Sequence, residues 1–262
     1  MIAGLAPSPA RRRLCAALIT VFLTAACSKA AGPTPAPSPP AGAKTAWFRS
    51  SDGVSLTGER FGNKGSVGVV LAHQYNADQS TWFGFAPLLA ANGYRVLTFN
   101  FRGFCTGAAS GAAACSGTRG KSDPAKAPQD LDGAIAYIRS QGAKKVFVIG
   151  ASMGGTAAMN VALQQHLAGV VTLSAPVSFM GLDAHASAAG RTPKLFIAGK
   201  DDPFGGASGA HTLYAQAPAR KQLLIVPSDQ HGAFLLSDDL DPSSAGQVRK
   251  AILQFLALYR GV

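Results

Sequence analysis

Residues Lys144–Leu163 read KKVFVIGASMGGTAAMNVAL, and this stretch decides the fold. Its apolar, mostly β-branched run over 146–149 predicts a strand buried on both faces. The glycine-flanked segment 150–154 (GASMG) follows at once, and small residues from 156 to 163 predict a helix. A serine between two glycines at a strand-to-helix turn indicates a nucleophile elbow, a strained turn that holds the Ser152 hydroxyl out from the carboxyl end of a sheet.

Gly150 and Gly154 would let the strand and the helix approach closely, because neither residue carries a side chain. The first turn of the helix would place the Met153 amide, with the positive end of the helix dipole, where an oxyanion forms during acyl transfer. The Gly-x-Ser-x-Gly pattern alone is weak evidence in a chain with 30 glycines among 262 residues. Its place between a strand and a helix favours an elbow around Ser152 over a glycine-rich turn that holds a serine by chance.

The first 26 residues predict a secretory signal peptide. Arg11–Arg13 precede a 13-residue apolar run that ends just before Cys27, and a run of this length is too short to span a bilayer as a permanent helix. The letters LTAAC that end at Cys27 resemble the lipobox of bacterial lipoproteins. That resemblance implies a lipidated Cys27 at the mature N-terminus and a location in the cell envelope, on the outer membrane where there is one because Ser28 replaces the retaining aspartate. A plain secreted protein is the alternative.

Residues 27–45 are rich in proline and alanine, a composition typical of an extended tether. The remaining segment, 46–262, is long enough for one catalytic domain. Of the 24 Lys and Arg and 13 Asp and Glu in the chain, five basic residues and no acidic ones lie in 1–44, which leaves the rest with a net charge of +6. These charges are scattered and favour a solvated surface with an affinity for anionic lipid or cell-wall polymer. They do not predict nucleic-acid binding.

Strands and helices alternate from Ala46 onward. A hairpin over 46–49 and 54–60 is expected to open the domain, around the turn Ser51–Gly53. Alternation of this kind predicts an α/β fold, with a mostly parallel sheet and helices on both of its faces. The expected strands cover 67–72, 95–99, 169–173, 194–198 and 221–226, and the expected helices cover 79–91, 129–140, 207–216 and 245–259.

A serine nucleophile needs a base and an acid that orients the base. His231 follows the expected strand 221–226, and the adjacent Asp201 and Asp202 follow the expected strand 194–198. The carboxyl ends of parallel strands meet at one edge of a sheet, so we expect these groups to lie near Ser152. Strand-end geometry alone does not choose between the two aspartates, and Asp183 is a more distant candidate.

Together these residues resemble the α/β-hydrolase family, in particular the small bacterial hydrolases of the dienelactone hydrolase and serine aminopeptidase-like type, over about residues 46–262. The segments GYRVL (93–97) and NFRG (100–103) are similar to a run in that family, although Asn100 stands where aspartate is usual. The family spacing Gly-x-x-Asp, met by 199–202, favours Asp202 as the acid. Dienelactone hydrolases proper use a cysteine nucleophile, so their specific reaction does not carry over to Ser152.

The resemblance also implies the rest of the catalytic surroundings. His73-Gln74-Tyr75 resembles the His-Gly-x motif of esterases, which implies that the Tyr75 amide joins that of Met153 in an oxyanion hole. Gln74 replaces the usual glycine and would hinder a bulky acyl group, and we expect His73 to pack rather than to react. Only about 20 residues separate the strands 169–173 and 194–198, so no large lid domain is expected.

Two of the four cysteines remain for the mature domain, besides Cys27 and the Cys15 of the signal peptide. Cys105 and Cys115 are ten residues apart in an exported protein and are predicted to form a disulfide. No further Cys or His lies at metal-ligand spacing and no cofactor motif occurs, so neither a metal nor a cofactor is expected.

The sequence therefore predicts a lipid-anchored serine hydrolase of the cell envelope. It would cleave a carboxylic ester of a small-molecule or acyl substrate through an acyl-enzyme on Ser152. A peptidase or an acyltransferase with the same triad is the first alternative. A catalytically idle, surface-binding module with the same fold is the second. The natural substrate and the oligomeric state are left open.

Overall fold

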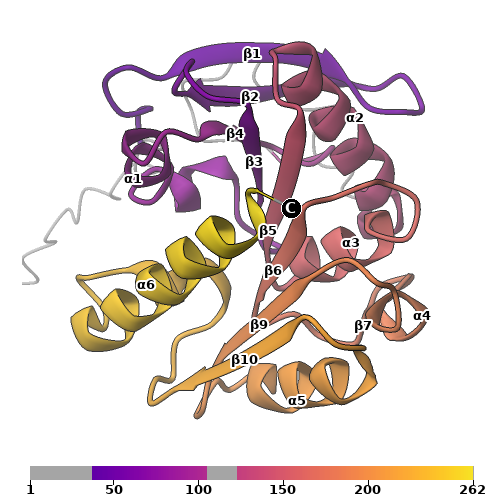
Figure 1. The fold of residues 1–262 in the computed structure, drawn as a ribbon, viewed down its shortest axis with the longest axis vertical. Helices are drawn as coiled ribbons and strands as arrows, with labels where there is room; N and C mark the ends of the chain where they lie inside the picture. The colour runs from indigo at the N-terminus through magenta and orange to yellow at the C-terminus, as the bar shows by residue number, and fades with distance from the viewer. Residues whose placement is uncertain (1–36, 105–122, 262) are drawn as a thin grey trace, which may run out of the picture. The chain divides into compact units, whose positions relative to one another are not determined.

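In the computed structural model, eight strands form one sheet in the order β1-β2-β4-β3-β5-β6-β9-β10 (Figure 1). The structure describes residues 37–104 and 123–261, all within one of the two units into which the chain divides, Pro33–Val262. β2 pairs antiparallel with both of its neighbours. The other neighbouring strands of this sheet, β4-β3-β5-β6-β9-β10, all pair in parallel. The strands are β1 (Lys44–Arg49), β2 (Ser55–Phe61), β3 (Val67–Ala72), β4 (Arg95–Phe99), β5 (Lys145–Ala151), β6 (Gly169–Leu173), β9 (Lys194–Gly199) and β10 (Lys221–Val226).

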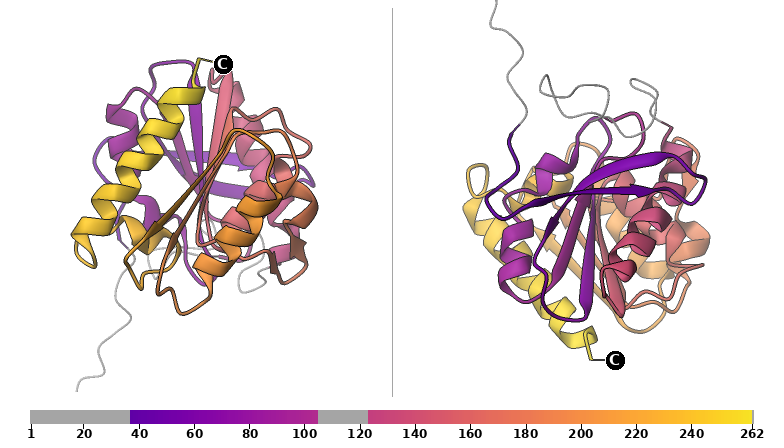
Figure 2. Two further views of the ribbon diagram at one scale, coloured as in Figure 1. Left: turned by 60° about the horizontal axis from the view of Figure 1, so that its bottom comes forward. Right: turned by 90° about the horizontal axis from the view of Figure 1, so that it is seen from above.

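The central strand β5 is buried on both faces, as its sequence predicts. Val146 and Val148 belong to one core cluster, and Phe147 and Ile149 belong to the other, because successive side chains of a strand point to opposite faces. Helices cover both faces of the sheet (Figures 1 and 2). The first cluster includes residues of α2 (Ala127–Ser140), α3 (Met153–Val161), α4 (His185–Ala188) and α5 (Gly206–Gln216), and the second includes residues of α1 (Ala86–Ala91) and α6 (Pro242–Tyr259).

The prediction of one helix over 79–91 is wrong in its first half. The chain forms a 3₁₀ turn, η1 (Gln79–Trp82), and a separate helix α1 that begins at Ala86. Pro87 has no amide hydrogen to donate and is favoured in the first turn of a helix, so a new helix starts there. The fully buried Trp82 ends the 3₁₀ turn in the core. The other expected helices and strands are present, with ends shifted by up to three residues.

The segment between β6 and β9 is short. Residues 174–193 contain the two-residue strands β7 (Ser178–Phe179) and β8 (Leu182–Asp183) and the single-turn helix α4. Over 37–104 and 123–261 the chain therefore has no large lid domain, as predicted. None of the helices in these ranges is both long enough and apolar enough to cross a membrane. The predicted signal peptide, Cys27, Cys105 and Cys115 lie outside the described residues.

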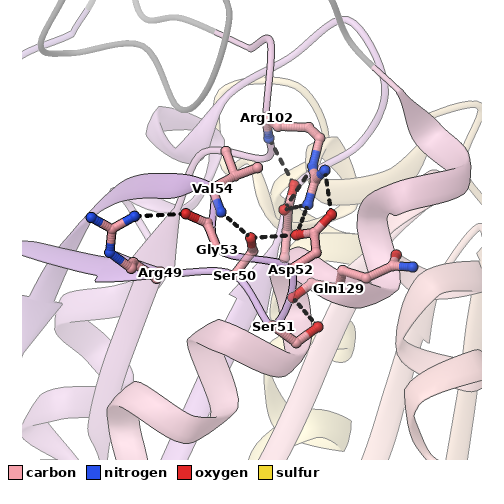
Figure 3. Close-up of polar contacts among 9 residues, drawn as sticks. Arg49, Ser50, Ser51, Asp52, Gly53, Val54, Arg102 and Gln129 are labelled. Atoms are coloured by element: carbon pink, nitrogen blue, oxygen red, sulfur yellow. Dashed lines mark hydrogen bonds and ion pairs between the residues drawn. The ribbon is translucent and has the colours of Figure 1, made fainter.

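Arg102 joins three elements at one corner of the fold (Figure 3). Its guanidinium donates two hydrogen bonds to Asp52 in the β1–β2 turn, at 2.8 and 2.6 Å. It also donates to the fully buried Asp130 of α2, at 2.9 and 2.6 Å, and the Arg102 amide donates to the same carboxylate. Hydrogen bonds from Arg102 and Ser50 hold the pKa of Asp52 well below its usual range. This cluster fixes the chain where it leaves β4.

Candidate active site

Ser152 lies at the turn between β5 and α3, with φ 47° and ψ −117°. A positive φ is uncommon for a residue with a side chain, and such strained angles persist only where the surroundings hold them. The Ser152 amide donates to the Leu173 carbonyl at 2.8 Å, and the Ser152 carbonyl accepts from the Gly155 and Thr156 amides at 2.9 and 3.1 Å. The ends of β5, β6 and α3 thus hold the elbow in place.

Glycine is required on both sides of Ser152. A Cβ atom on Gly150 would lie 2.3 Å from the Gly154 carbonyl oxygen, and one on Gly154 would lie 2.4 Å from the Ala72 carbonyl oxygen. Both distances are shorter than any real contact, because the strand and the helix meet backbone to backbone here. Because α3 begins directly after Ser152, its first amide is that of Met153.

The structure brings Asp202 to His231. The Asp202 carboxylate lies 2.8 Å (Oδ2) and 3.0 Å (Oδ1) from His231 Nδ1, and Asp202 itself is buried. Its Oδ1 also accepts the Phe204 amide at 2.9 Å. Gly206, at the start of α5, makes room for the carboxylate, since a Cβ atom there would lie 2.2 Å from Oδ2.

The other two aspartates lie elsewhere. Asp201 is exposed to solvent, although it is the direct neighbour of Asp202. Asp183 accepts the His185 amide at 2.8 Å, at the start of α4. Of the three candidates from the sequence, only Asp202 contacts His231.

The contact with Asp202 defines which nitrogen of His231 can act as a base. A carboxylate only accepts hydrogen bonds, so Nδ1 carries the proton and Nε2 presents a lone pair. Ser152 and His231 line the same cavity, which has a volume of about 490 Å³. Among the described residues no hydrogen bond joins Ser152 Oγ to His231. Such bonds are often long in enzymes without substrate and tighten in the reacting complex.

The cavity wall includes the aromatic side chains of Tyr75, Phe179, Phe204 and Phe234, beside polar residues such as Asp229. The Phe204 ring packs on His231 with centroids 4.8 Å apart, and the Tyr75 and Phe179 rings pack at 5.3 Å. Phe204 and Phe234 are also exposed at the mouth, at 76% and 45% of their surface. A wall of this kind suits an apolar acyl or aryl group.

His73 packs in the interior, as expected from the sequence. It is fully buried, its Nε2 accepts the Phe101 amide at 3.0 Å, and its Nδ1 donates to the Gln74 carbonyl at 2.7 Å. Burial lowers the pKa of His73 to about 4, so the ring is neutral at pH 7. It joins the loop after β3 to the loop after β4.

The role of Gln74 does not follow from its sequence neighbourhood. Gln74 lines the cavity, and its Oε1 accepts the buried Ala233 amide at 2.9 Å, two residues after His231. Gly232 is needed beside it, because a Cβ atom there would lie 2.5 Å from Oε1. Gln74 therefore ties the loop that carries Tyr75 to the loop that carries His231.

The Tyr75 and Met153 amides are the two expected oxyanion donors. Met153 is the first residue of α3, and the first amides of a helix have no acceptor within it. In the ranges that the structure covers, neither amide donates a hydrogen bond to another group. The same ranges contain no group of three or more His, Cys, Asp or Glu that could hold a metal ion.

Comparison with known proteins finds a matching family model and solved structures of similar fold. Residues 68–189 match the family model described as alpha/beta hydrolase fold, while no curated protein sequence matches the chain. An esterase of Pyrococcus furiosus is 18% identical, with 83% of this chain and 92% of that chain covered and a TM-score of 0.68. A hydrolase from Pseudomonas aeruginosa is 18% identical (83% and 99% covered, TM-score 0.65), and a monoacylglycerol lipase of Paleococcus ferrophilus is 19% identical (78% and 99% covered, TM-score 0.64).

Proposed function

Because this chain has the α/β-hydrolase fold, we propose that it is a serine hydrolase that cleaves carboxylic esters with Ser152, His231 and Asp202. The observation that carries the proposal is the Asp202–His231 pair, 2.8 Å apart, in which His231 lines the same cavity as the strained Ser152. A nucleophile, a base and an orienting acid from three separate loops would act together there, which is the arrangement that acyl transfer needs.

The reaction follows from the positions of these groups. His231 Nε2 takes the proton of the Ser152 hydroxyl as Oγ bonds to the ester carbonyl carbon, and Asp202 stabilises the imidazolium that forms. The carbonyl oxygen becomes an oxyanion that accepts hydrogen bonds from the Met153 and Tyr75 amides. When the intermediate collapses, the bond to the alkoxy oxygen breaks and His231 gives its proton to the leaving alcohol. Water then attacks the acyl-enzyme by the same steps and releases the acid.

The substrate class is supported by the cavity and by the short segment between β6 and β9. An apolar aromatic wall favours an uncharged acyl or aryl ester, and residues 174–193 leave the site without a large covering domain. Within the fold, we group the chain with the small bacterial hydrolases of the dienelactone hydrolase and serine aminopeptidase-like type. The structural neighbours include proteins named as esterases and as a lipase.

We also propose that the enzyme works in the cell envelope. The proposal is supported by the arginines and the apolar run before Cys27 and by the Pro/Ala-rich stretch after it. Cys27 would carry the lipid anchor, and residues 27–45 would hold the domain away from the membrane. In that oxidising location Cys105 and Cys115 would form a disulfide.

A fluorophosphonate probe tests the proposed nucleophile. We expect the purified protein to be labelled and the Ser152→Ala variant to be unlabelled, with turnover lowered by about 10⁴–10⁶. Ser208→Ala, an exposed serine of α5, is the matched control and should label as the wild type does. Residual activity of Ser152→Ala above about a hundredth of the wild type would contradict the assignment.

A substrate panel separates the remaining alternatives. Esters, thioesters and aminoacyl amides should be tested together, because the same triad serves esterases, peptidases and acyltransferases. Faster turnover of amides than of esters would make the chain a peptidase, and transfer to an added alcohol in preference to water would make it an acyltransferase. A folded protein that neither labels nor turns over any substrate would be a binding module.

A further inference from the structure

A second cavity, of about 550 Å³, lies at the opposite edge of the sheet from Ser152. Its lining includes Lys145, Ala168, Pro193 and Arg220, which stand at or just before the amino ends of β5, β6, β9 and β10. The proposed active site lies at the carboxyl ends of the same parallel strands. A strand rises by about 3.3 Å per residue, so the seven-residue β5 separates the two sites by roughly 20 Å.

The side chains around this cavity are strongly cationic. Lys144, Lys145, Arg191 and Arg220 line it, and among the described residues its lining contains no Asp or Glu. Lys144, Arg191 and Arg220 are all exposed, and Arg220 donates to the Arg191 carbonyl at 3.1 Å, which holds the turns before β9 and β10 together. Like charges around a concave surface raise the local positive potential and concentrate anions.

The acidic side chain that hydrogen bonds connect to this cavity is Asp132, and it already has polar partners. Gln165 lines the cavity and donates to Asp132 at 3.1 Å, while Arg139 donates to the Gln165 side chain at 2.6 Å. Burial raises the pKa of Asp132, and the hydrogen bond from Gln165 and the charge of Arg139 offset only part of that effect. That carboxylate therefore does not neutralise the cations of the cavity.

Lys194 adds a buried positive charge behind the wall. It is 1% exposed, and its ammonium donates to the carbonyls of Gly190 and Thr192, both of which line the cavity. In the described part of the chain it forms no ion pair with a carboxylate. Burial and the charge of Arg220 lower the pKa of Lys194 to about 8, so most of it is still charged at pH 7. A buried charge without a counterion is unfavourable, and an anion in the cavity would relieve it.

We propose that this cavity is an anion site for a phosphate group, either free or as the headgroup of an anionic lipid. The guanidinium groups of Arg191 and Arg220 and the ammonium group of Lys144 suit a tetrahedral oxyanion with more than one charge, since arginine binds phosphate oxygens in pairs and lysine acts as a point charge. A single carboxylate has too few oxygens to engage all three. This phosphate site takes no part in the proposed ester hydrolysis, and its existence does not depend on that reaction.

Titration calorimetry of the full chain with inorganic phosphate, at constant ionic strength, tests the site. We expect saturable binding of one phosphate per chain. The double variant Lys144→Gln/Arg191→Gln should bind at least about tenfold more weakly, because two of the three contacting charges are gone. The control Lys64→Gln/Lys126→Gln removes the same charge from exposed positions elsewhere and should bind as the wild type does. Arg220 is left unchanged because its φ of 68° and its contact with Arg191 hold the turn.

Thermal unfolding of both double variants without phosphate checks that they are folded. Absence of saturable phosphate binding to the folded wild type would overturn the proposal. Equal weakening in the two double variants would also overturn it, because the effect would then come from net charge and not from the cavity.

Vesicles distinguish the two sources of phosphate. The Cys27→Ser chain, which has no lipid anchor, should be mixed with phosphatidylcholine vesicles with and without phosphatidylglycerol. Binding that needs phosphatidylglycerol, is displaced by free phosphate and is lost in Lys144→Gln/Arg191→Gln supports a lipid headgroup. Phosphate binding without vesicle binding supports a soluble phosphate. Vesicle binding that persists in this variant and resists free phosphate would overturn the cavity as the site.

Discussion

Asp201 and Asp202 are adjacent in the chain but have opposite surroundings. Asp202 is buried and accepts from His231 at 2.8 Å, whereas Asp201 is exposed. We predict that Asp202→Asn lowers kcat by about 10⁴, because an amide in that position leaves His231 in the wrong tautomer. Asp201→Asn is the matched control and should change kcat by less than about tenfold. Steady-state kinetics on one ester decides between them, and the reverse ranking would move the role to Asp201.

If the proposed function holds, Gln74 is a positioning residue, because it holds the segment that follows His231. Gln74→Met keeps the length of the side chain but removes the acceptor of the buried Ala233 amide. An unsatisfied buried donor costs about 1–3 kcal/mol, so the segment 231–233 should shift. A displacement of about 1 Å lowers catalysis on the order of 10²-fold, and we expect a loss in kcat of that size.

Gln74→Glu separates positioning from a purely structural role. The carboxylate still accepts from Ala233, so most of kcat should return. It also adds a negative charge near His231, which favours the imidazolium and should move the acid limb of the kcat/KM profile to higher pH. Unchanged kcat in Gln74→Met would show that the hydrogen bond to Ala233 does not position the base.

His73 should make the protein less stable in mild acid. Burial lowers its pKa to about 4 in the folded state, against 6.5 for an ordinary histidine, so between these values the unfolded chain binds more protons. The free energy of unfolding should therefore fall as the pH is lowered from about 6.5 to about 4, by on the order of 3 kcal/mol. Urea unfolding at several pH values measures this slope.

The slope should disappear in His73→Gln, which can still donate and accept but does not titrate. His211→Gln, an exposed histidine of α5, is the control and should keep the slope of the wild type. An unchanged slope in His73→Gln would assign the acid sensitivity to other groups.

At the scale of elements, Arg102 joins β1–β2, the end of β4 and α2. Arg102→Gln leaves the fully buried Asp130 without its cation and Asp52 without its partner. Removing one member of a buried ion pair costs about 3–5 kcal/mol, so we predict a loss of that size in the free energy of unfolding. Urea unfolding measures it.

Arg249→Gln provides the comparison for that measurement. It breaks the ion pair with Asp238, whose side chain is 62% exposed, and should cost less than about 1 kcal/mol beyond the loss of a bond to the Leu236 carbonyl. Similar losses in Arg102→Gln and Arg249→Gln would mean that the three elements are held by packing and not by Arg102.

Elements were predicted well where their signals are local and less well where two signals compete. The strand-turn-helix around Ser152 combines a buried apolar run with flanking glycines, and the structure has all three parts in place. The expected helix over 79–91 has a helical pattern, but Pro87 starts a second helix inside it. A proline near the middle of a periodic stretch is the signal that could have corrected the prediction.

At the scale of the whole molecule, lipidation at Cys27 is the proposal that most affects where the enzyme acts. We predict that Cys27→Ser moves the protein from the membrane fraction to the soluble fraction of the envelope, because a lipid chain is the proposed attachment. Fractionation with a high-salt wash, followed by detection of the protein, measures this. Cys15→Ser, in the apolar run of the signal peptide, is the control and should remain with the membranes. A Cys27→Ser protein that still sediments after the wash would contradict lipidation.

The two proposed sites occupy opposite edges of one sheet. The carboxyl ends of the parallel strands carry Ser152 and His231, and the amino ends carry the cationic cavity. If anionic headgroups bind at Lys144 and Arg191, the catalytic edge points away from the bilayer that supplies them. A substrate would then arrive from the side opposite the membrane.

The sequence by itself determined the α/β fold and the positions of Ser152 and His231, because strands, turns and helices depend on residues close together in the chain. The tertiary structure decided which aspartate contacts His231, where the family resemblance had only favoured Asp202, and how the loops around His231 are tied. His231 and Asp202 are 29 residues apart, and Gln74 contacts a residue 159 positions away. Contacts at such separations leave no mark on local composition or periodicity, because only the packing of the whole sheet brings their loops to one edge.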